Sequence, residues 1–360
     1  MVEPKKILVI ATRRIGDVLL TTPLIRSLKQ AHPDSKIDVV VYRKTASILS
    51  GNSDCDQLLE VEESASFSAT WCFLKSIYRK YDIAISTQGG DRAYLMLLVA
   101  SSKRYGLIGD PLKKSWWKRL SSKFLLLDNL NTHTVTQNLK LLELLGIKAI
   151  SDVIPPRAPT LQLNIDLSRP YVVLHPFPMF RYKEWLLDNW IELSRYLISK
   201  GYLILLSGGP SQAEVNLCND LKRQISEEAD DVQVLAGQID FDELSIILQK
   251  AAFYVGPDTV VTHLAAAVGC KTVALFGPSN PVKWGPWPAK QELVKSPWVL
   301  LGPDGIQTQK NVAILQEVMH CVPCMGEGCD GSLSSDSRCI RSITVERVRS
   351  ALSILGIYPS

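Results

Sequence analysis

The sequence predicts an α/β protein built from two doubly wound domains, and three observations lead to this prediction. Short apolar runs rich in β-branched residues alternate with amphipathic segments along most of the chain. A proline-rich stretch, residues 151–170, interrupts this alternation near the middle. The length of 360 residues is that of about two ordinary domains. Because each amphipathic helix needs a sheet face to cover, we expect two parallel sheets with helices on both faces.

The first half begins with an apolar run, residues 5–10, that has the composition of a buried parallel strand. Pro23 lies inside the helical pattern of residues 17–32 and predicts either a kink or a very short first segment. The other expected strands are residues 36–42 and 81–87, and the other expected helices are residues 73–80, 92–102 and 134–147.

The second half restarts the alternation after Pro170. The expected strands are residues 171–176, 202–209, 232–237, 253–256 and 271–277, and the expected helices are residues 184–201, 211–224, 241–251, 259–269 and 344–356. We therefore predict a first domain of residues 1–155, a linker of residues 156–170, a second domain of residues 171–340 and a C-terminal helical segment of residues 341–360.

Composition excludes several classes of protein. Apolar residues make up 46% and charged residues 21%, as in globular proteins, so a disordered chain is not expected. The net charge, 40 − 36 = +4, is too small to indicate a nucleic-acid-binding protein. No apolar run reaches the ~18 residues of a membrane helix. The first apolar run is followed directly by Arg13 and Arg14, unlike a secretory signal, so we expect a soluble, cytoplasmic protein.

Three common motifs are missing from the sequence. The first strand is followed by ATRRIGD rather than the G-x-G-x-x-G of a dinucleotide site. Neither a P-loop nor the G-x-S-x-G of a nucleophile elbow is present. The sequence therefore disfavours nicotinamide-dependent hydride transfer, P-loop phosphoryl transfer and α/β-hydrolase chemistry.

Asp17 follows the first expected strand, at the sheet edge where open α/β proteins bind their ligands. Gly16 permits a tight turn before it. Asp17 either caps the helix that follows or directs its carboxylate into the binding cleft, and the motif alone leaves both interpretations open.

A second candidate site follows Gly256, where a strand leads into a helix rich in small residues. The first N–H groups of a helix lack intrahelical partners and attract anions, so this helix start suits a diphosphate. The alternative is a capped helix with a histidine in the core. The polar residues of this segment are Asp258, Thr259, Thr262 and His263.

Lys183 lies in the turn after the first strand of the second half, close to Arg181. A lysine at the carboxyl end of a strand can neutralise a leaving phosphate. The alternative is a pair of solvated charges.

These segments resemble glycosyltransferase family 9, the bacterial ADP-heptose:lipopolysaccharide heptosyltransferases. Four matches carry the resemblance over nearly the whole chain: residues 13–41, which contain RRIGDVLLTTP; residues 133–142, HTVTQNLKLL; residues 258–267, DTVVTHLAAA; and a C-x-x-C with two further cysteines.

The resemblance implies a GT-B fold, in which two Rossmann-like domains face each other across a cleft and the last helix returns towards the first domain. It implies transfer of heptose, with inversion, from ADP-heptose to the inner core of lipopolysaccharide, without a catalytic metal or another cofactor. Asp17 then matches the general base, Lys183 the lysine near the donor phosphates, and Glu214 an acidic residue near the nucleoside. Gly256, Asp258, Thr259, Thr262 and His263 fall at the diphosphate-binding helix.

Val260 stands where the family has a glycine, and this difference keeps alternatives open. A β-branched residue restricts the approach of a ligand to the backbone, so another nucleotide-sugar donor remains possible. A catalytically silent sugar-nucleotide-binding protein is an alternative from a different class. Such a protein needs no general base, so the presence of Asp17 together with Lys183 argues against it. An epimerase of similar architecture is a third alternative.

A basic cluster with tryptophans lies within residues 111–127. This composition suits an anionic membrane surface or a phosphorylated, lipid-linked acceptor, such as the lipopolysaccharide core or lipid A. A solvated helix that covers the first sheet is the alternative. The expected acceptor-binding residues are Arg13, Arg14, Lys113, Lys114, Trp116, Trp117, Lys118 and Arg119. We therefore expect a peripheral location at the inner face of the inner membrane.

Four of the eight cysteines, Cys321, Cys324, Cys329 and Cys339, crowd into the C-terminal region with the spacing C-x2-C-x4-C-x9-C. This spacing is compatible with structural zinc, although the second pair is not spaced like a usual zinc knuckle. Reduced, packed cysteines are the other interpretation.

Overall fold

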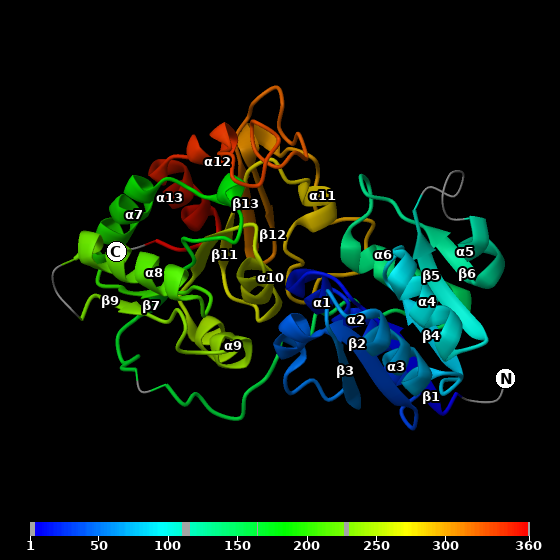
Figure 1. Cartoon of the computed structure of the whole chain (residues 1–360). Helices are drawn as coiled ribbons and strands as arrows, with labels where there is room; N and C mark the ends of the chain where they lie inside the picture. The colour runs from blue at the N-terminus through cyan, green and yellow to red at the C-terminus, as the bar shows by residue number, and fades with distance from the viewer. Residues whose placement is uncertain (1–3, 110–115, 164, 227–229, 359–360) are drawn as a thin grey trace. The chain divides into compact units, whose positions relative to one another are not determined.

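The computed structural model describes residues 4–109, 116–163, 165–226 and 230–358. The chain divides into two compact units (Figure 1). The first unit contains Met1–Pro156 and Lys290–Lys295, and the second contains Arg157–Ala289 and Ser296–Ser360. The main division after Pro156 falls inside the proline-rich stretch.

The first unit is a six-stranded parallel sheet in the order β3-β2-β1-β4-β5-β6. Its strands are β1 (Lys6–Ile10), β2 (Lys36–Tyr42), β3 (Gln57–Val61), β4 (Ile83–Ser86), β5 (Lys103–Ile108) and β6 (Lys123–Leu126). The chain winds outwards from β1 in both directions, so the sheet is doubly wound, as predicted.

The helices of the first unit are α1 (Ile15–Leu19), α2 (Thr22–Ala31), α3 (Phe67–Ile77), α4 (Asp91–Ala100), α5 (Trp116–Ser121) and α6 (Thr134–Lys140). Short 3-10 turns follow at Arg43–Leu49 and Glu143–Leu145. Pro23 lies in the first turn of α2, where its missing N–H costs nothing, so the prediction of a very short first segment is confirmed.

The second unit is a seven-stranded sheet in the order β12-β13-β11-β10-β7-β8-β9. Its strands are β7 (Tyr171–Leu174), β8 (Leu203–Leu206), β9 (Val232–Val234), β10 (Tyr254–Pro257), β11 (Thr272–Phe276), β12 (Ile306–Gln309) and β13 (Val312–Gln316). Only β12 is antiparallel to its neighbour. Without β12, the order is again that of a doubly wound sheet.

The helices of the second unit are α7 (Leu187–Ser199), α8 (Gln212–Ile225), α9 (Phe241–Lys250), α10 (Val260–Ala267), α11 (Pro281–Trp284), α12 (Arg338–Arg341) and α13 (Val345–Ile354). Short 3-10 turns form at Arg181–Lys183 and Pro303–Gly305. No helix within the described ranges combines the length and the apolar character needed to cross a bilayer.

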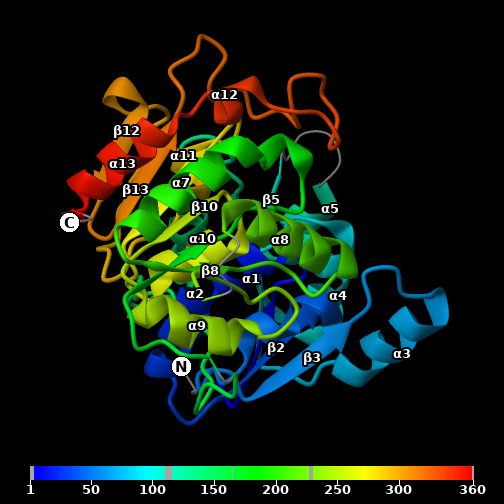
Figure 2. The same ribbon diagram turned by 90° about the vertical axis from the view of Figure 1, so that its left-hand side faces the viewer.

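The last helix belongs to the second unit, and its expected return towards the first domain stays a prediction. Helix α13 packs on α7 and on the second sheet, as Figure 2 illustrates. Val345, Val348 and Leu352 contribute its apolar stripe to the core of the second unit, which explains this placement. The short segment Lys290–Lys295, from the second half of the chain, belongs to the first unit.

Five strands, β3, β5, β6, β12 and β13, were not predicted. Strands β3 and β6 are short and half exposed, and β6 lies in the segment that the sequence analysis interpreted as a basic cluster. Helix α3 also begins earlier than expected, at Phe67. The residues of its first two turns are mostly exposed, so they lack the buried apolar face from which a helix is predicted.

Candidate functional site

The carboxyl ends of the strands position the candidate residues of the second unit. Strand β7 leads into the turn that contains Lys183, β10 leads into Asp258, and β11 leads into Ser279. Strands β7 and β10 are neighbours in the sheet. From β7 the chain adds β8 and β9 on one side, and from β10 it adds β11 and β13 on the other. Such a switch point leaves a crevice at the carboxyl ends of the strands, where α/β proteins bind ligands.

Lys183 and Asp258 form a buried ion pair at this switch point. The Lys183 Nζ lies 2.6 Å from Asp258 Oδ2 and donates a second hydrogen bond, of 2.9 Å, to the Asp258 carbonyl. The two side chains are 16% and 8% exposed. An ammonium has three N–H donors, so within the described residues one is left for a ligand. The structure therefore holds a cation in a fixed position at the strand ends.

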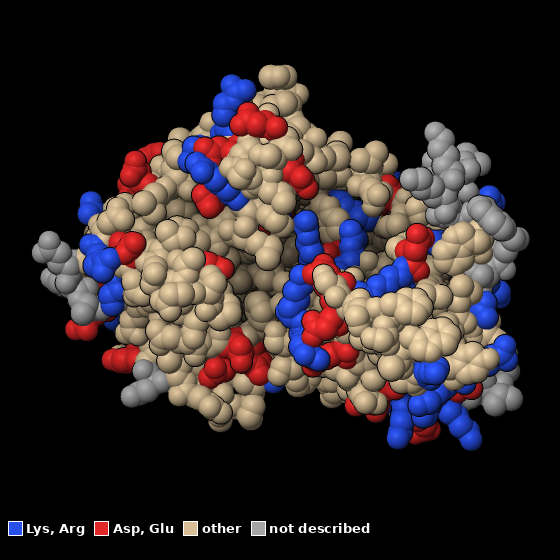
Figure 3. Space-filling model, in the orientation of Figure 1, with Lys and Arg blue, Asp and Glu red and all other residues tan. Residues whose placement is uncertain are grey.

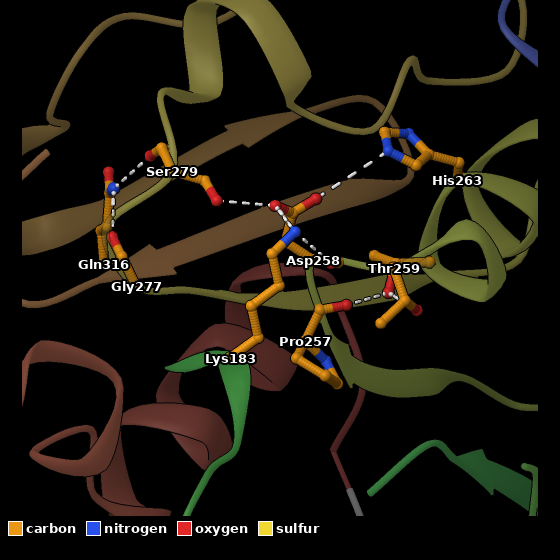
Figure 4. Close-up of polar contacts among 9 residues, drawn as sticks. Lys183, Pro257, Asp258, Thr259, His263, Gly277, Ser279 and Gln316 are labelled. Carbon is orange, nitrogen blue, oxygen red and sulfur yellow. Dashed lines mark hydrogen bonds and ion pairs between the residues drawn. The ribbon is translucent and has the colours of Figure 1, made fainter. Parts of the chain in front are cut away.

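Three groups surround the Asp258 carboxylate (Figure 4). The Ser279 hydroxyl donates to Oδ2 at 2.7 Å, and the His263 Nε2 lies 4.0 Å from Oδ1. Burial opposes the charged form, but the Lys183 ammonium and the hydrogen bonds from Lys183 and Ser279 hold the pKa of Asp258 below its ordinary value. The carboxylate is therefore charged at neutral pH.

His263 is buried and electrically neutral. Burial lowers the pKa of His263 to about 4, the Asp258 carboxylate opposes this shift, and the Lys183 ammonium adds to it. Its Nδ1 has no hydrogen-bond partner among the described residues. A buried polar atom without a partner costs free energy, and a ligand that bonds to this nitrogen would remove that cost.

The polar residues at the start of α10 divide into two groups. The Thr262 hydroxyl donates to the Pro257 carbonyl and lies 2.9 Å from the Tyr254 hydroxyl, so its bonding stays inside the protein. Thr259 is the N-cap residue, and its side chain does not cap the helix. The expected roles of both threonines at a diphosphate stay predictions, and the contacts favour Thr259.

Contacts within the protein account for the glycine at position 256 and for the carboxylate of Glu214. A Cβ on Gly256, inside β10, would lie 2.0 Å from the Tyr254 hydroxyl. Glu214 lies in the first turn of α8, where the hydroxyl of the N-cap residue Ser211 accepts from the Glu214 N–H. The Glu214 carboxylate accepts from the Gly209 N–H at 2.6 Å. The nucleoside role of Glu214 stays a prediction.

The sequence analysis did not single out Ser279 and Gln316. Gln316 is buried at the end of β13, and its amide donates to the carbonyls of Gly277 and Ser279, each at 3.0 Å. It thereby holds the turn from which Ser279 reaches Asp258. The sequence FGPSNP marks the turn, but the contact of Gln316 with it depends on a strand that was not predicted.

Asp17 lies in the first unit, after β1, as the third residue of α1. Arg14 is the N-cap residue, so Asp17 does not cap the helix. The Asp17 side chain is 11% exposed, and its Oδ1 lies 3.5 Å from an Arg13 guanidinium nitrogen. Arg13 and Arg14 are exposed. The turn thus presents a mostly buried carboxylate beside two surface cations.

The described residues of the predicted basic cluster make separate contacts within the first unit. Lys113 and Lys114 lie outside the described residues, and Trp116 is the first residue of α5. Trp117 packs edge-to-face on Tyr94, with ring centroids 6.0 Å apart. Arg119 lies over the ring of Phe124.

Lys118 is buried rather than displayed to an acceptor. Its Nζ lies 2.7 Å from Asp91 Oδ1, and it also donates to the Gly89 carbonyl. Lys118 therefore fixes the loop before α4, and its expected contact with an acceptor does not fit this position.

All four C-terminal cysteines are free thiols; Cys339 is buried and the other three are exposed. Over the described part of the chain, no group of three or more His, Cys, Asp or Glu side chains is arranged to hold a metal ion. The structure therefore does not support the zinc interpretation of this cluster.

Residues 70–299 match Glycosyltransferase family 9 (heptosyltransferase). Lipopolysaccharide heptosyltransferase 3 of Escherichia coli strain K12 is 30% identical over 292 residues, which cover 76% of this chain and 82% of that protein. Lipopolysaccharide heptosyltransferase 2 of the same strain is 26% identical over 301 residues, which cover 77% and 84%.

Solved structures of similar fold include a family 9 glycosyltransferase from Veillonella parvula, with a TM-score of 0.74, 19% identity and coverage of 98% of this chain and 97% of that one. The E. coli ADP-heptose lps heptosyltransferase II has a TM-score of 0.72 and 19% identity, with coverage of 97% and 98%. These similarities confirm the GT-B fold class and, with the family match, the predicted enzyme class. The chain belongs to glycosyltransferase family 9 and is a glycosyltransferase.

Proposed function

We propose that the chain transfers heptose, with inversion, from ADP-heptose to the inner core of lipopolysaccharide. The observation that carries the proposal is the buried Lys183–Asp258 pair beside the start of α10, in a chain of this family. A fixed cation next to the first N–H groups of a helix suits the diphosphate of a nucleotide sugar. The names of the curated relatives support heptose as the sugar and lipopolysaccharide as the acceptor.

The second unit stabilises the leaving group in this mechanism. As the acceptor oxygen forms its bond to the anomeric carbon, the bond to the diphosphate oxygen breaks and negative charge grows on ADP. The third N–H of Lys183 and the first amides of α10 stabilise this charge, and His263 Nδ1 offers one further contact. Each well-placed donor typically contributes about 3 kcal/mol to such a transition state. ADP-heptose is the co-substrate, and the proposal requires no other cofactor.

The first unit supplies the base. Asp17 accepts the proton of the attacking acceptor hydroxyl, and Arg13 and Arg14 bind a phosphate or carboxylate of the acceptor. A carboxylate in the first turn of a helix is a weak base, because the helix dipole favours its charged form. The limited exposure of Asp17 works in the opposite direction, because desolvation disfavours that charge.

The proposed acceptor is a core oligosaccharide anchored to lipid A. An enzyme that acts on such an acceptor works at a membrane surface, so we place this chain peripherally at the inner face of the inner membrane.

Val260 supports a second candidate for the donor. It is the first residue of α10, so its branched side chain lies beside the amides proposed to bind the diphosphate. A donor with a different sugar, such as a hexose or an N-acetylhexosamine, is the alternative.

A donor panel with purified protein and truncated core acceptor tests the proposal. The proposal predicts transfer from ADP-heptose and none from UDP-hexoses or UDP-N-acetylhexosamines. Transfer from UDP-sugars alone would reject the heptose assignment, and binding of ADP-heptose without transfer to any core acceptor would favour the silent binding protein.

A further inference from the structure

Helix α3 in the first unit carries large aromatic side chains on its outer face. Phe67 is 86% exposed, Trp71 is 52% exposed, and Tyr78, directly after the helix, is 61% exposed. Residues four apart lie above one another on a helix, so Phe67, Trp71 and Lys75 form one stripe. We call Phe67, Trp71, Lys75, Tyr78, Arg79 and Lys80 the α3 face.

The core of the first unit does not require these aromatic residues. Helix α3 is anchored by Leu74 and Ile77, which are buried in the cluster that also contains residues of α4. Figure 2 shows α3 at the rim of the first unit, with its outer side directed away from the sheet. Polar residues would serve equally well at Phe67 and Trp71 if this face only met water.

The charge of the α3 face has one sign. Residues 64–81 contain three basic residues and no Asp or Glu. The acid that precedes them, Glu63, is paired with Lys44. The acid that follows, Asp82, accepts hydrogen bonds from the backbone N–H groups of Lys5 and Lys6.

The basic side chains lie among the aromatic rings. The Lys75 Nζ is 5.5 Å from the centre of the Trp71 ring, and the Arg79 guanidinium is 5.9 Å from that of Tyr78. In Figure 3 the surface over α3 and α4 is mostly tan, with basic side chains at its lower edge. Leu95, on the outer side of α4, adds an exposed apolar side chain.

This combination indicates the kind of partner. The centres of protein–protein interfaces are depleted in lysine, whereas Trp and Tyr with Lys and Arg are typical of the boundary between lipid headgroups and acyl chains. Basic residues there are attracted to anionic lipids. We infer that the α3 face docks the enzyme on the surface of an anionic lipid bilayer, with Phe67 and Trp71 inserted between headgroups.

The inference rests on the proposed function only in that a lipid-anchored acceptor gives the enzyme a reason to bind a membrane. It also moves the expected membrane contact from residues 111–127, where Lys118 is buried, to α3.

Flotation of the purified full-length protein with lipid vesicles tests the inference. Vesicles of phosphatidylglycerol and phosphatidylethanolamine are compared with vesicles of phosphatidylcholine, at low and high salt. We expect binding to the anionic vesicles alone, weakened by salt because the charges are exposed. The Phe67→Ser/Trp71→Ser and Lys75→Glu/Lys80→Glu variants should each bind at least about tenfold more weakly.

The matched control is Leu217→Ser/Lys250→Glu, which makes the same kinds of change at exposed residues of the second unit. It should bind vesicles like the wild type. Transfer to a deacylated, water-soluble core acceptor should be unchanged in all three variants, which also shows that they fold.

Absence of vesicle binding by the wild type, or wild-type binding by both α3 variants, overturns the inference. A dimer in sedimentation that the α3 variants convert into a monomer also overturns it, because the face is then a contact between two copies. Failure of the wild type to transfer heptose to the soluble acceptor, with vesicle binding intact, contradicts the proposed function and leaves the docking face standing.

Discussion

Apart from β12, the two units share one strand order, but they differ in how their polar groups are bonded at the carboxyl ends of the strands. In the second unit, Gln316 holds the turn of Ser279, Ser279 holds Asp258, and Asp258 holds Lys183. In the first unit, the corresponding edge carries Asp17, with a guanidinium at 3.5 Å. Polar groups that are already held by such a network need little rearrangement when charge develops on a ligand beside them. The second unit therefore suits a diphosphate that is bound in one geometry. The role that we propose for Asp17 of the first unit is that of a proton acceptor.

The largest effect should come from removing Lys183. The Lys183→Met substitution leaves the Asp258 carboxylate buried without its cation, which typically costs about 3–5 kcal/mol of unfolding free energy. Transfer should fall by about a hundredfold or more, because the leaving diphosphate loses a cationic partner. Urea unfolding and initial rates measure the two effects.

The double variant Lys183→Met/Asp258→Asn separates these effects. It removes the unpaired charge, so stability should largely recover while transfer stays low. Recovery of transfer together with stability would show that Lys183 only maintains the fold.

The next largest effect concerns the pH dependence of stability. Burial lowers the pKa of both His175 and His263 to about 4, so the unfolded chain binds more protons than the folded chain between about pH 6.5 and pH 4. The contribution of these two histidines to the unfolding free energy is therefore fully present above pH 6.5. It falls as the pH drops, by at most about 1.4 kcal/mol per pH unit for each histidine.

Urea unfolding of the wild type and of His175→Gln and His263→Gln, at several pH values from 7 to 5, measures this slope. Each substitution should reduce it, and the same change at exposed His320 controls for the loss of any imidazole. An equal slope in the wild type and both variants would mean that neither ring is buried in its neutral form.

A smaller effect is expected from the Ser279 hydroxyl. The Ser279→Ala substitution removes a 2.7 Å hydrogen bond to a charged carboxylate, which is typically worth about 1.5–3 kcal/mol. Because Asp258 then holds Lys183 less firmly, the KM for ADP-heptose should rise about tenfold. Ser279→Thr keeps the hydroxyl and should restore most of the affinity, and a KM that Ser279→Ala leaves at the wild-type value would exclude this positioning role.

The smallest effect concerns Glu214 and separates two roles. Glu214→Ala removes the carboxylate that bonds to the Gly209 N–H, so unfolding free energy should fall by about 0.5–2 kcal/mol, as for the loss of a helix cap. If the capping contact explains this residue, ADP affinity measured by calorimetry stays within a few-fold. A large loss of ADP affinity would instead support the nucleoside role.

Sequence reasoning reached the parts of the molecule that depend on local pattern. Strand–helix alternation predicted both sheets, and the rule that parallel strands end at one edge placed Lys183 and Asp258 at the same crevice.

The rest depended on packing between distant segments. Strand β12 begins in a half-exposed segment, and without the pairing of β12 and β13 nothing in the sequence connects Gln316 with Ser279. Lys118 looked like a surface residue because its partners, Gly89 and the first residue of α4, Asp91, precede it by more than 25 positions. Phe67 and Trp71 lie before the predicted helix of residues 73–80, so the sequence analysis did not single them out, and only the structure shows that they are exposed.

The most direct test of the division of roles measures ADP affinity and transfer rate side by side in Asp17→Asn and in Lys183→Met/Asp258→Asn. The account predicts that Asp17→Asn binds ADP within a few-fold of the wild type while transfer falls by about a hundredfold or more, and that the Lys183 variant loses ADP affinity. Near-normal transfer by Asp17→Asn, or wild-type ADP affinity in the Lys183 variant, would contradict it.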